Sequence, residues 1–303
     1  MLAILALSLS FTACNKEASS GSTSSNSTST QTDDEAMVNN ETDATSNDAT
    51  AALEGVGGSF AERPEGINPF IPFPCDATIT VDTISMQKTI TITYNGSNCY
   101  GTRLRTGKVI LSFDSTLHWQ DAGAYVTVTY DSLKITRIWD GKTIMINGTK
   151  TIENVSGGLL KNLGTLNTIT HNITSSGLTI TFNNGAQGIW NISKQRVFTY
   201  NNGIDITTTG AKDTLGTVVA VWGINRYGNA FTSAITQPRV IEQSCDFRLV
   251  SGQTLYNGPN VTSTTTFGLD SLGNHVTACP SGLFYYEVVW TQNGKTNTFI
   301  APY

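Results

Sequence analysis

Residues 126–137 read VTVTYDSLKITR, and in both halves of this stretch apolar or aromatic side chains alternate with polar ones. The same texture recurs at residues 78–84, 89–94 and 108–113, where Thr and Ile dominate. Both residue types branch at Cβ, which stiffens χ1 and suits a pleated surface. A period of two with one apolar face is typical of antiparallel strands that turn one side toward a core. The sequence therefore predicts an all-β fold.

Residues that tolerate positive φ separate the alternating runs. They predict hairpin turns at Asp140-Gly141, Asn183-Asn184-Gly185, Asn201-Asn202-Gly203 and Asn293-Gly294. Asn95-Gly96 has the same composition, whereas Asn147-Gly148 fits either a turn or a bulge inside a strand. The spacing of these turns predicts twelve to fourteen strands in a large antiparallel meander, which curls as a sandwich or an open barrel. A soft domain boundary is conceivable at residues 156–158, and no amphipathic helix is expected.

The first thirteen residues, MLAILALSLSFTA, form an apolar run too short to span a bilayer and end in small residues before Cys14. This resembles the lipobox of bacterial lipoproteins, in which residues 1–13 would be the signal peptide and Cys14 would carry lipid. The alternative is an ordinary signal peptide followed by a chance Cys. Lys16 and Glu17 resemble a Bacteroidetes export signal, so we expect an outer-membrane protein at the cell surface or on the periplasmic face.

The segment after Cys14 is polar and acidic. Residues 15–59 contain no aromatic residue, and nine acids lie between Lys16 and Arg63 without a cation. Such a composition buries too little apolar surface to offset its ordering entropy. Residues 14–62 are therefore expected to be a lipidated Cys and a disordered Ser/Thr/Asp-rich tether, and residues 70–303 the β-rich domain. No basic run with interleaved aromatic residues exists, so no nucleic-acid partner is expected.

Four further cysteines are expected to form disulfides, because an even number is typical of exported domains. They allow three pairings, of which Cys75–Cys99 and Cys245–Cys279 are favoured because each closes a short loop. Free buried thiols are the alternative. A metal site is not expected, since no Cys-x-x-Cys occurs and His118, His171 and His275 are far apart in sequence. No cofactor is expected either.

The order of segments resembles that of uncharacterised Bacteroidetes cell-envelope lipoproteins with a β-rich body. The matching pieces are Cys75 with residues 78–81, residues 95–99, 105–110, 126–130 and 147–152, and Cys245 leading to Cys279. The resemblance implies a β-rich envelope lipoprotein and brings no biochemical activity with it.

Catalytic motifs with a fixed spacing are not found in the sequence. A polysaccharide hydrolase could still bring two carboxylates together, from the candidates Asp114, Asp121, Asp131, Glu153, Glu242 and Glu287. Aromatic side chains could stack on sugars, although most strand aromatics fill a core. The five tryptophans are Trp119, Trp139, Trp190, Trp222 and Trp290, and His118-Trp119-Gln120-Asp121 is the most conspicuous polar-aromatic loop.

An Asp followed by a hydroxyl residue recurs five times. This resembles the O-glycosylation acceptor of exported Bacteroidetes proteins and would place glycans on Thr83, Ser115, Ser132, Thr214 and Ser271. Asx turns at strand ends explain the same pattern equally well.

These observations favour an envelope lipoprotein that is a non-catalytic binding or structural module, held to the membrane by its lipid and binding a glycan or a protein. A hydrolase acting on polysaccharide through two carboxylates is the alternative. The sequence does not decide whether the chain is an enzyme, although the absence of catalytic motifs favours a protein that is not one.

Overall fold

The computed structural model describes residues 20–55 and 72–303. Six positions in the second range lie outside the description: Met86, Ser115, Leu117, Leu215, Asn260 and Asn293. Side chains of the first range are described from residue 29 onward. Cys14 and the predicted signal peptide therefore lie outside the described residues.

The fold is all-β, as predicted, and is dominated by one antiparallel sheet of fourteen strands. The strands are β1 (Ala77–Asp82), β2 (Lys88–Ser97), β3 (Arg103–Phe113), β4 (Ala124–Arg137), β5 (Thr143–Asn154), β6 (Thr168–Phe182), β7 (Gln187–Tyr200), β8 (Ile204–Gly210), β11 (Val221–Ile224), β12 (Ala230–Glu242), β13 (Arg248–Gly258), β14 (Val261–Leu269), β15 (Tyr285–Gln292) and β16 (Lys295–Pro302). A separate ribbon pairs β9 (Lys212–Thr214) with β10 (Thr217–Val219).

The sheet is a meander with one irregular point. Strands β1 to β7 pair in chain order, and so do β12 to β16, while the short strands β8 and β11 both lie between β7 and β12. The sheet passes without interruption through β5 and β6, on either side of residues 156–158, so that loop does not divide it. Short helical turns η1 (Leu160–Asn162), α2 (Leu163–Leu166) and η2 (Gln243–Cys245) fill connections.

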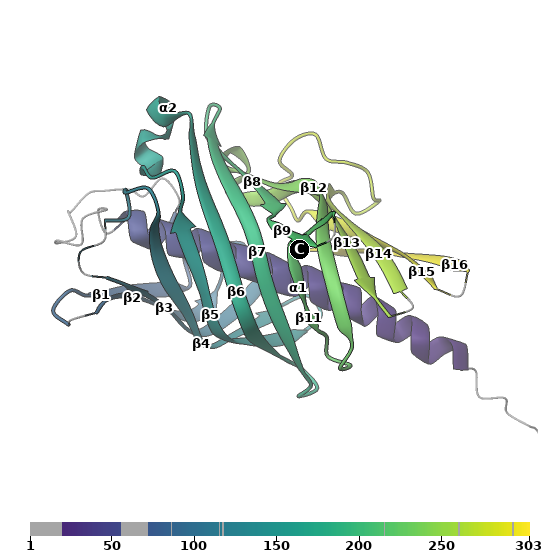
Figure 1. Cartoon of the computed structure of the whole chain (residues 1–303). Coiled ribbons are helices and arrows are strands. Elements are labelled where there is room, and N and C mark those ends of the chain that lie inside the picture. Colours follow the sequence, from purple (N-terminus) through teal and green to yellow (C-terminus); the bar gives the residue numbers. More distant parts are fainter. Residues whose placement is uncertain are drawn as a thin grey trace, which may run out of the picture.

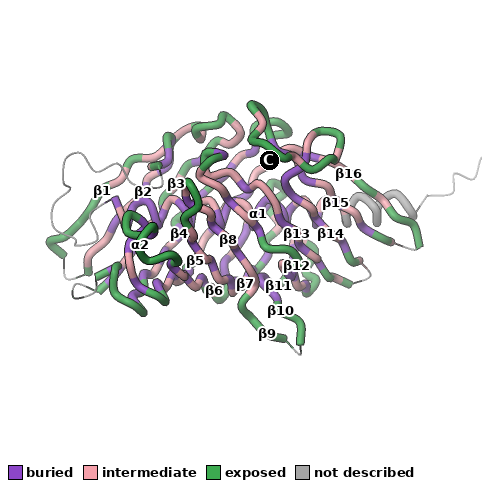
Figure 2. The backbone as a smooth tube through the Cα atoms, turned by 90° about the horizontal axis from the view of Figure 1, so that it is seen from above, coloured by how far each residue is buried: buried purple, intermediate pink, exposed green. Residues whose placement is uncertain are grey.

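A 36-residue helix, α1 (Ser20–Gly55), lies along the concave side of the sheet, which curls around it (Figure 1). Buried residues alternate with less buried ones along the strands (Figure 2). Helix α1 contributes to both hydrophobic clusters of the core, for example through Val38, Ala51 and Leu53. The described part of the chain contains no helix long and apolar enough to cross a membrane.

Helix α1 corrects one prediction, because residues 20–55 are not a disordered tether. The helix has no apolar stripe, so hydrophobic periodicity could not reveal it. Its interior hydroxyls donate to carbonyls one turn earlier, as Thr45 does to Thr42 and Thr50 does to Ser46. Small polar side chains thus satisfy their own hydrogen bonds and let the helix fit inside the curled sheet.

The turn predictions hold at three hairpins, which connect β4–β5, β6–β7 and β7–β8. Gly294 also lies between two strands, β15 and β16, although Asn293 lies outside the described residues. Asn147-Gly148 is a bulge, since the register shifts there on both sides of β5. Asn95-Gly96 is not a turn: both residues pair with β3 inside β2.

Both favoured disulfides are present. Cys75–Cys99 joins the segment before β1 to the β2–β3 loop, and Cys245–Cys279 joins the β12–β13 loop to the segment before β15. In each pair the Cα atoms are 5.3 Å apart, within the range that a disulfide spans.

Candidate functional site

The interior of the curled sheet is cationic, and α1 supplies the opposite charge. Nine Arg and Lys residues with little exposure point inward: Arg103, Arg105, Arg137, Lys142, Lys150, Lys194, Arg196, Arg226 and Arg239. The acids of α1 bind most of them. Asp43 lies 2.7 Å from Lys194, Asp48 2.8 Å from Arg105, and Glu41 pairs with Arg103.

The N-terminal half of α1 is held in the same way. Asp33 lies 2.7 Å from Nη1 of Arg137 and accepts a hydrogen bond from the Tyr286 hydroxyl. Asp34 lies 2.5 Å from Nε of Arg226 and 2.6 Å from Nζ of Lys142. These contacts join α1 to strands from both ends of the sheet, so they close the fold as well as compensate charge.

Burial sets the ionisation of the groups around α1. Burial alone would raise the pKa of Asp43, but Lys194 and Arg239 lower it to about 2. Burial raises the pKa of Glu54 to about 7, against the opposing hydrogen bond from the Leu160 N–H. Lys150 donates to the carbonyl of Thr42 and to hydroxyls of α1, and burial lowers its pKa well below the ordinary range.

A crevice of about 450 Å³ opens beside α1, and we call it the α1 crevice. Its volume falls in the range of ordinary small-molecule sites. Its walls come from α1, the β2–β3 loop, β12, the β12–β13 loop and the segment before β15. The residues used below are Asn40, Glu41, Asp43, Asn47, Asp48, Phe73, Tyr100, Arg103, Arg105, Arg239, Phe247, Arg248, Phe284 and Tyr303.

The two disulfide-bonded loops meet at this crevice. The Tyr100 hydroxyl, next to Cys99, donates to the carbonyl of Asp246, next to Cys245. Arg248 then donates to the carbonyls of Cys245, Pro280 and Gly282, with its guanidinium 5.0 Å from the Phe284 ring. The crevice is therefore preformed, because covalent and polar bonds fix both of its rims.

Backbone strain marks the same rim. Asp246 and Phe247 have φ of 58° and 55°, and a bulky residue such as Phe rarely adopts this left-handed region. Strain of this kind persists only where surrounding contacts enforce it, and it collects at ligand clamps. Here the Cys245–Cys279 disulfide and the Arg248 hydrogen bonds supply those contacts.

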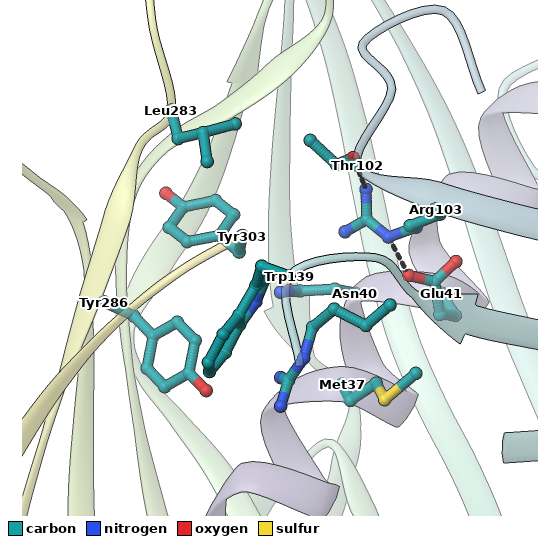
Figure 3. Close-up of a pocket in the computed structure, with 10 residues that line it drawn as sticks. Met37, Asn40, Glu41, Thr102, Arg103, Trp139, Leu283, Tyr286 and Tyr303 are labelled. Atoms are coloured by element: carbon teal, nitrogen blue, oxygen red, sulfur yellow. Dashed lines mark hydrogen bonds and ion pairs between the residues drawn. The ribbon is translucent and has the colours of Figure 1, made fainter. Parts of the chain in front are cut away.

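A cavity of about 20 Å³ adjoins the α1 crevice and shares Tyr303 and Arg103 with it (Figure 3). The Trp139 ring, from the β4–β5 turn, lies opposite Tyr286 and Tyr303 in this view, and the dashed lines join Arg103 to Glu41 and Thr102. Trp139 is 49% exposed and packs against Arg137 at 4.6 Å. This contact is local, because Arg137 ends β4 and Trp139 follows it in the β4–β5 turn.

The predicted carboxylate candidates are not gathered at the crevice. Asp114, Asp121 and Asp131 are exposed, and Glu153, Glu242 and Glu287 are half-buried on separate strands. Glu242 does lie opposite Asp205 across β8 and β12, and burial followed by repulsion from Glu242 raises the pKa of Asp205. Neither residue lines the crevice.

The predicted aromatic candidates mostly fill the core. Trp119, Trp190 and Trp290 are buried, so the loop 118–121 presents no free indole ring. Trp139 lines the adjoining cavity of about 20 Å³. Among the described residues, no cluster of three His, Cys, Asp or Glu side chains could hold a metal ion.

Four of the five Asp-hydroxyl pairs behave as turns, whereas Asp131-Ser132 lies inside β4, where the Ser132 N–H donates to Asn147. Asp82, Asp114, Asp213 and Asp270 each accept a backbone N–H two or three residues ahead, which is the Asx-turn alternative. The proposed acceptors Thr83, Ser132, Thr214 and Ser271 are exposed, whereas Ser115 lies outside the described residues. Glycosylation at these positions therefore stays a prediction.

Comparison with protein-family models, curated proteins and solved structures found no match to this chain. The site must therefore be interpreted from its own geometry. Sequence reasoning missed the crevice residues of α1, because it assigned them to a tether. The signal that could have found them is the charge segregation, since nine acids without a cation precede a domain with 17 Lys or Arg and 14 Asp or Glu.

Proposed function

We propose that this chain is a non-catalytic glycan-binding module of a bacterial outer membrane, held there by lipid on Cys14, and that the α1 crevice is its binding site. Its position at the cell surface or on the periplasmic face is part of the proposal. The observation that carries the binding role is a preformed crevice with aromatic walls next to fixed polar groups.

The chemistry of the crevice suits a sugar. Tyr100 and Phe247 offer apolar ring faces, on which the C–H face of a sugar can pack. Asn40, Asn47 and Arg103 offer amide and guanidinium groups for its hydroxyls. Of the charged lining residues, four are Arg and four are Asp or Glu, and this balance favours a ligand of low net charge.

A hydrolase remains the second candidate, and one observation favours it. Asp43 and Asp48 both line the crevice, and their pKa values move in opposite directions: that of Asp43 is lowered, whereas burial and the neighbouring Asp76 raise that of Asp48. Two acids whose pKa values are shifted in opposite directions are what glycoside hydrolysis needs. However, the Asp48 carboxylate already binds Arg105 and Tyr94, and the Asp43 carboxylate already binds Lys194. Neither acid is free to react with a substrate, which favours binding over catalysis.

A glycan array with the unlipidated Cys14→Ser chain tests the proposal. We expect a hit whose affinity falls roughly tenfold in Tyr100→Ala or Phe247→Ala, since each loses one ring contact. Tyr125→Ala is the matched control, because Tyr125 is exposed and lies outside the crevice. Binding to no glycan, or equal losses in all three variants, would count against the proposal.

Two further measurements separate the other parts. Release of reducing ends from the bound polysaccharide, lost in Asp48→Asn, would favour the hydrolase instead. Intact-mass analysis of the membrane-extracted chain should show acyl chains on Cys14, and an unmodified Cys14 would remove the anchor from the proposal.

A further inference from the structure

A row of buried polar side chains crosses five strands beneath α1. Asn154 of β5 is paired with His171 of β6, His171 with Arg196 of β7, Arg196 with Thr208 of β8, and Thr208 with Arg239 of β12. Each of the five residues is at most 2% exposed. A continuous polar row at this depth is costly unless its groups are hydrogen-bonded.

Several groups of this row lack such bonds. Six side-chain atoms make no hydrogen bond within the described part of the chain: Asn154 Oδ1, both ring nitrogens of His171, Nε of Arg196, and Nε and Nη1 of Arg239. Three of the six are guanidinium N–H groups, which can only donate. Asn47 accepts from Arg196, Asn40 accepts from Arg239, and Nη1 of Arg239 lies 3.4 Å from Asp43. The Nε groups of both arginines are left without an acceptor in the described part of the chain.

Charge around the two arginines is also unbalanced. Lys150, Lys194, Arg196 and Arg239 are all buried there, and the facing carboxylates of α1 are Asp43, Glu35 and Asp48. Asp48 already pairs with Arg105. Asp43 lies 2.7 Å from Lys194 and 3.4 Å from Arg239. Burial lowers the pKa of Arg196 to about 10, and Arg239 adds to the effect, which is the behaviour of a cation short of counter-charge.

The arginines are positioned to share one acceptor. They flank Thr208 from opposite sides, and each guanidinium has an aromatic ring on one face, Phe198 at 5.4 Å for Arg196 and Phe267 at 4.8 Å for Arg239. Their edges therefore remain for polar contacts. Arg239 lines the α1 crevice together with Asn47, the residue that accepts from Arg196, so the crevice leads from solvent to Arg239.

We propose that Arg196 and Arg239 form a binding site for one small monovalent anion between α1 and the sheet. The site takes a halide ion or the carboxylate of a small organic acid, because both present compact negative charge to N–H donors. The anion site shares Arg239 with the α1 crevice but requires no glycan, so it survives if the glycan proposal fails.

Bromide tests the site directly because its anomalous scattering locates it in a crystal. Crystals of the full chain with Cys14→Ser, grown in sodium bromide, should show one anomalous peak within hydrogen-bond distance of Arg196 and Arg239. Crystals grown in sodium acetate instead should show a carboxylate there if organic acids are the occupant. Ordered water at these nitrogens under both conditions overturns the proposal.

Thermal unfolding gives a second readout. At constant ionic strength set with sodium HEPES, bromide or acetate should raise Tm along a saturating curve, by about 5 °C at saturation. The gain should vanish in Arg196→Gln and persist in Arg248→Gln, the matched control at the crevice rim, whose three nitrogens already donate to carbonyls. If Arg196→Gln fails to fold, the crystallographic result decides alone. A Tm that depends on ionic strength alone, and not on which anion is present, would contradict the site.

Discussion

Replacing Asp43 by Asn should destabilise the protein strongly, because this side chain serves two buried cations. The Asp43 carboxylate lies 2.7 Å from Nζ of Lys194, which is 1% exposed. At an effective dielectric constant of about 20, two unit charges at that distance attract by about 6 kcal/mol, before desolvation is subtracted. Removal of one partner from such a buried pair costs about 3–5 kcal/mol, because the other charge stays buried without compensation. We expect a loss in this range.

Urea denaturation followed by tryptophan fluorescence measures the loss, since Trp119 and Trp190 are buried and report global unfolding. A double variant, Asp43→Asn with Lys194→Met, should recover about 2 kcal/mol of it, because the orphaned cation is gone. Asp121→Asn is the matched control: Asp121 is exposed and should cost less than about 0.5 kcal/mol. A loss for Asp43→Asn no larger than that of the control would refute the reasoning, because α1 would then not be docked.

Three further perturbations have signs that follow from the structure. Burial and Arg196 lower the pKa of His171 from 6.5 to about 3, so between these pH values the folded chain binds fewer protons than the unfolded chain. The free energy of unfolding should therefore fall by on the order of 4 kcal/mol as the pH drops from 6.5 to 3. His171→Leu should flatten that part of the stability curve. Burial raises the pKa of Glu54 from 4.5 to about 7, so the folded chain holds this proton more tightly than the unfolded chain. About 3 kcal/mol of stability should therefore be lost as the pH rises from 4.5 to 7. Glu54→Gln should abolish that loss in the same urea titrations. Replacing Cys245 and Cys279 together by Ser opens a loop with a sequence separation of 34 and should cost about 3–4 kcal/mol in the chain-entropy model; an unchanged urea midpoint would show that the loop is held by other contacts.

The sheet was predictable because its signal is local. The alternation of apolar and polar side chains in residues such as 126–130 predicts which face of a strand is buried. Turn pairs such as Asp140-Gly141 predict where the chain reverses. Asn95-Gly96 shows the limit of this reasoning, since the same residues are paired inside β2. Cross-strand pairing overrode the local preference for a turn.

Helix α1 was not predictable by the same route, because its stability is not local. Its Ser, Thr, Asn and Asp residues are weak helix formers, and an isolated helix of this kind is not stable in water. The cations that stabilise it lie far away in sequence, as Lys194 does from Asp43, 151 positions earlier. Composition rules treat such a segment as disordered because they count apolar burial and omit buried ion pairs with a partner elsewhere in the chain.

The crevice depends on contacts that no sequence pattern encodes. Both disulfides could be paired from loop length, but the meeting of their loops through Tyr100 and Asp246 follows only from the curl of the sheet. The left-handed backbone at Asp246 and Phe247 likewise has no local signal, since neither is Gly.

Hydrogen exchange of α1 tests the account most directly. In the native Cys14→Ser chain, mass spectrometry of peptides covering residues 31–53 should show amides that exchange on the order of a thousandfold more slowly than an unstructured chain, as expected for a helix enclosed by the core. Exchange of these amides within seconds, at the rate of a free polar coil, would show that α1 does not occupy the sheet and would remove the basis of the α1 crevice.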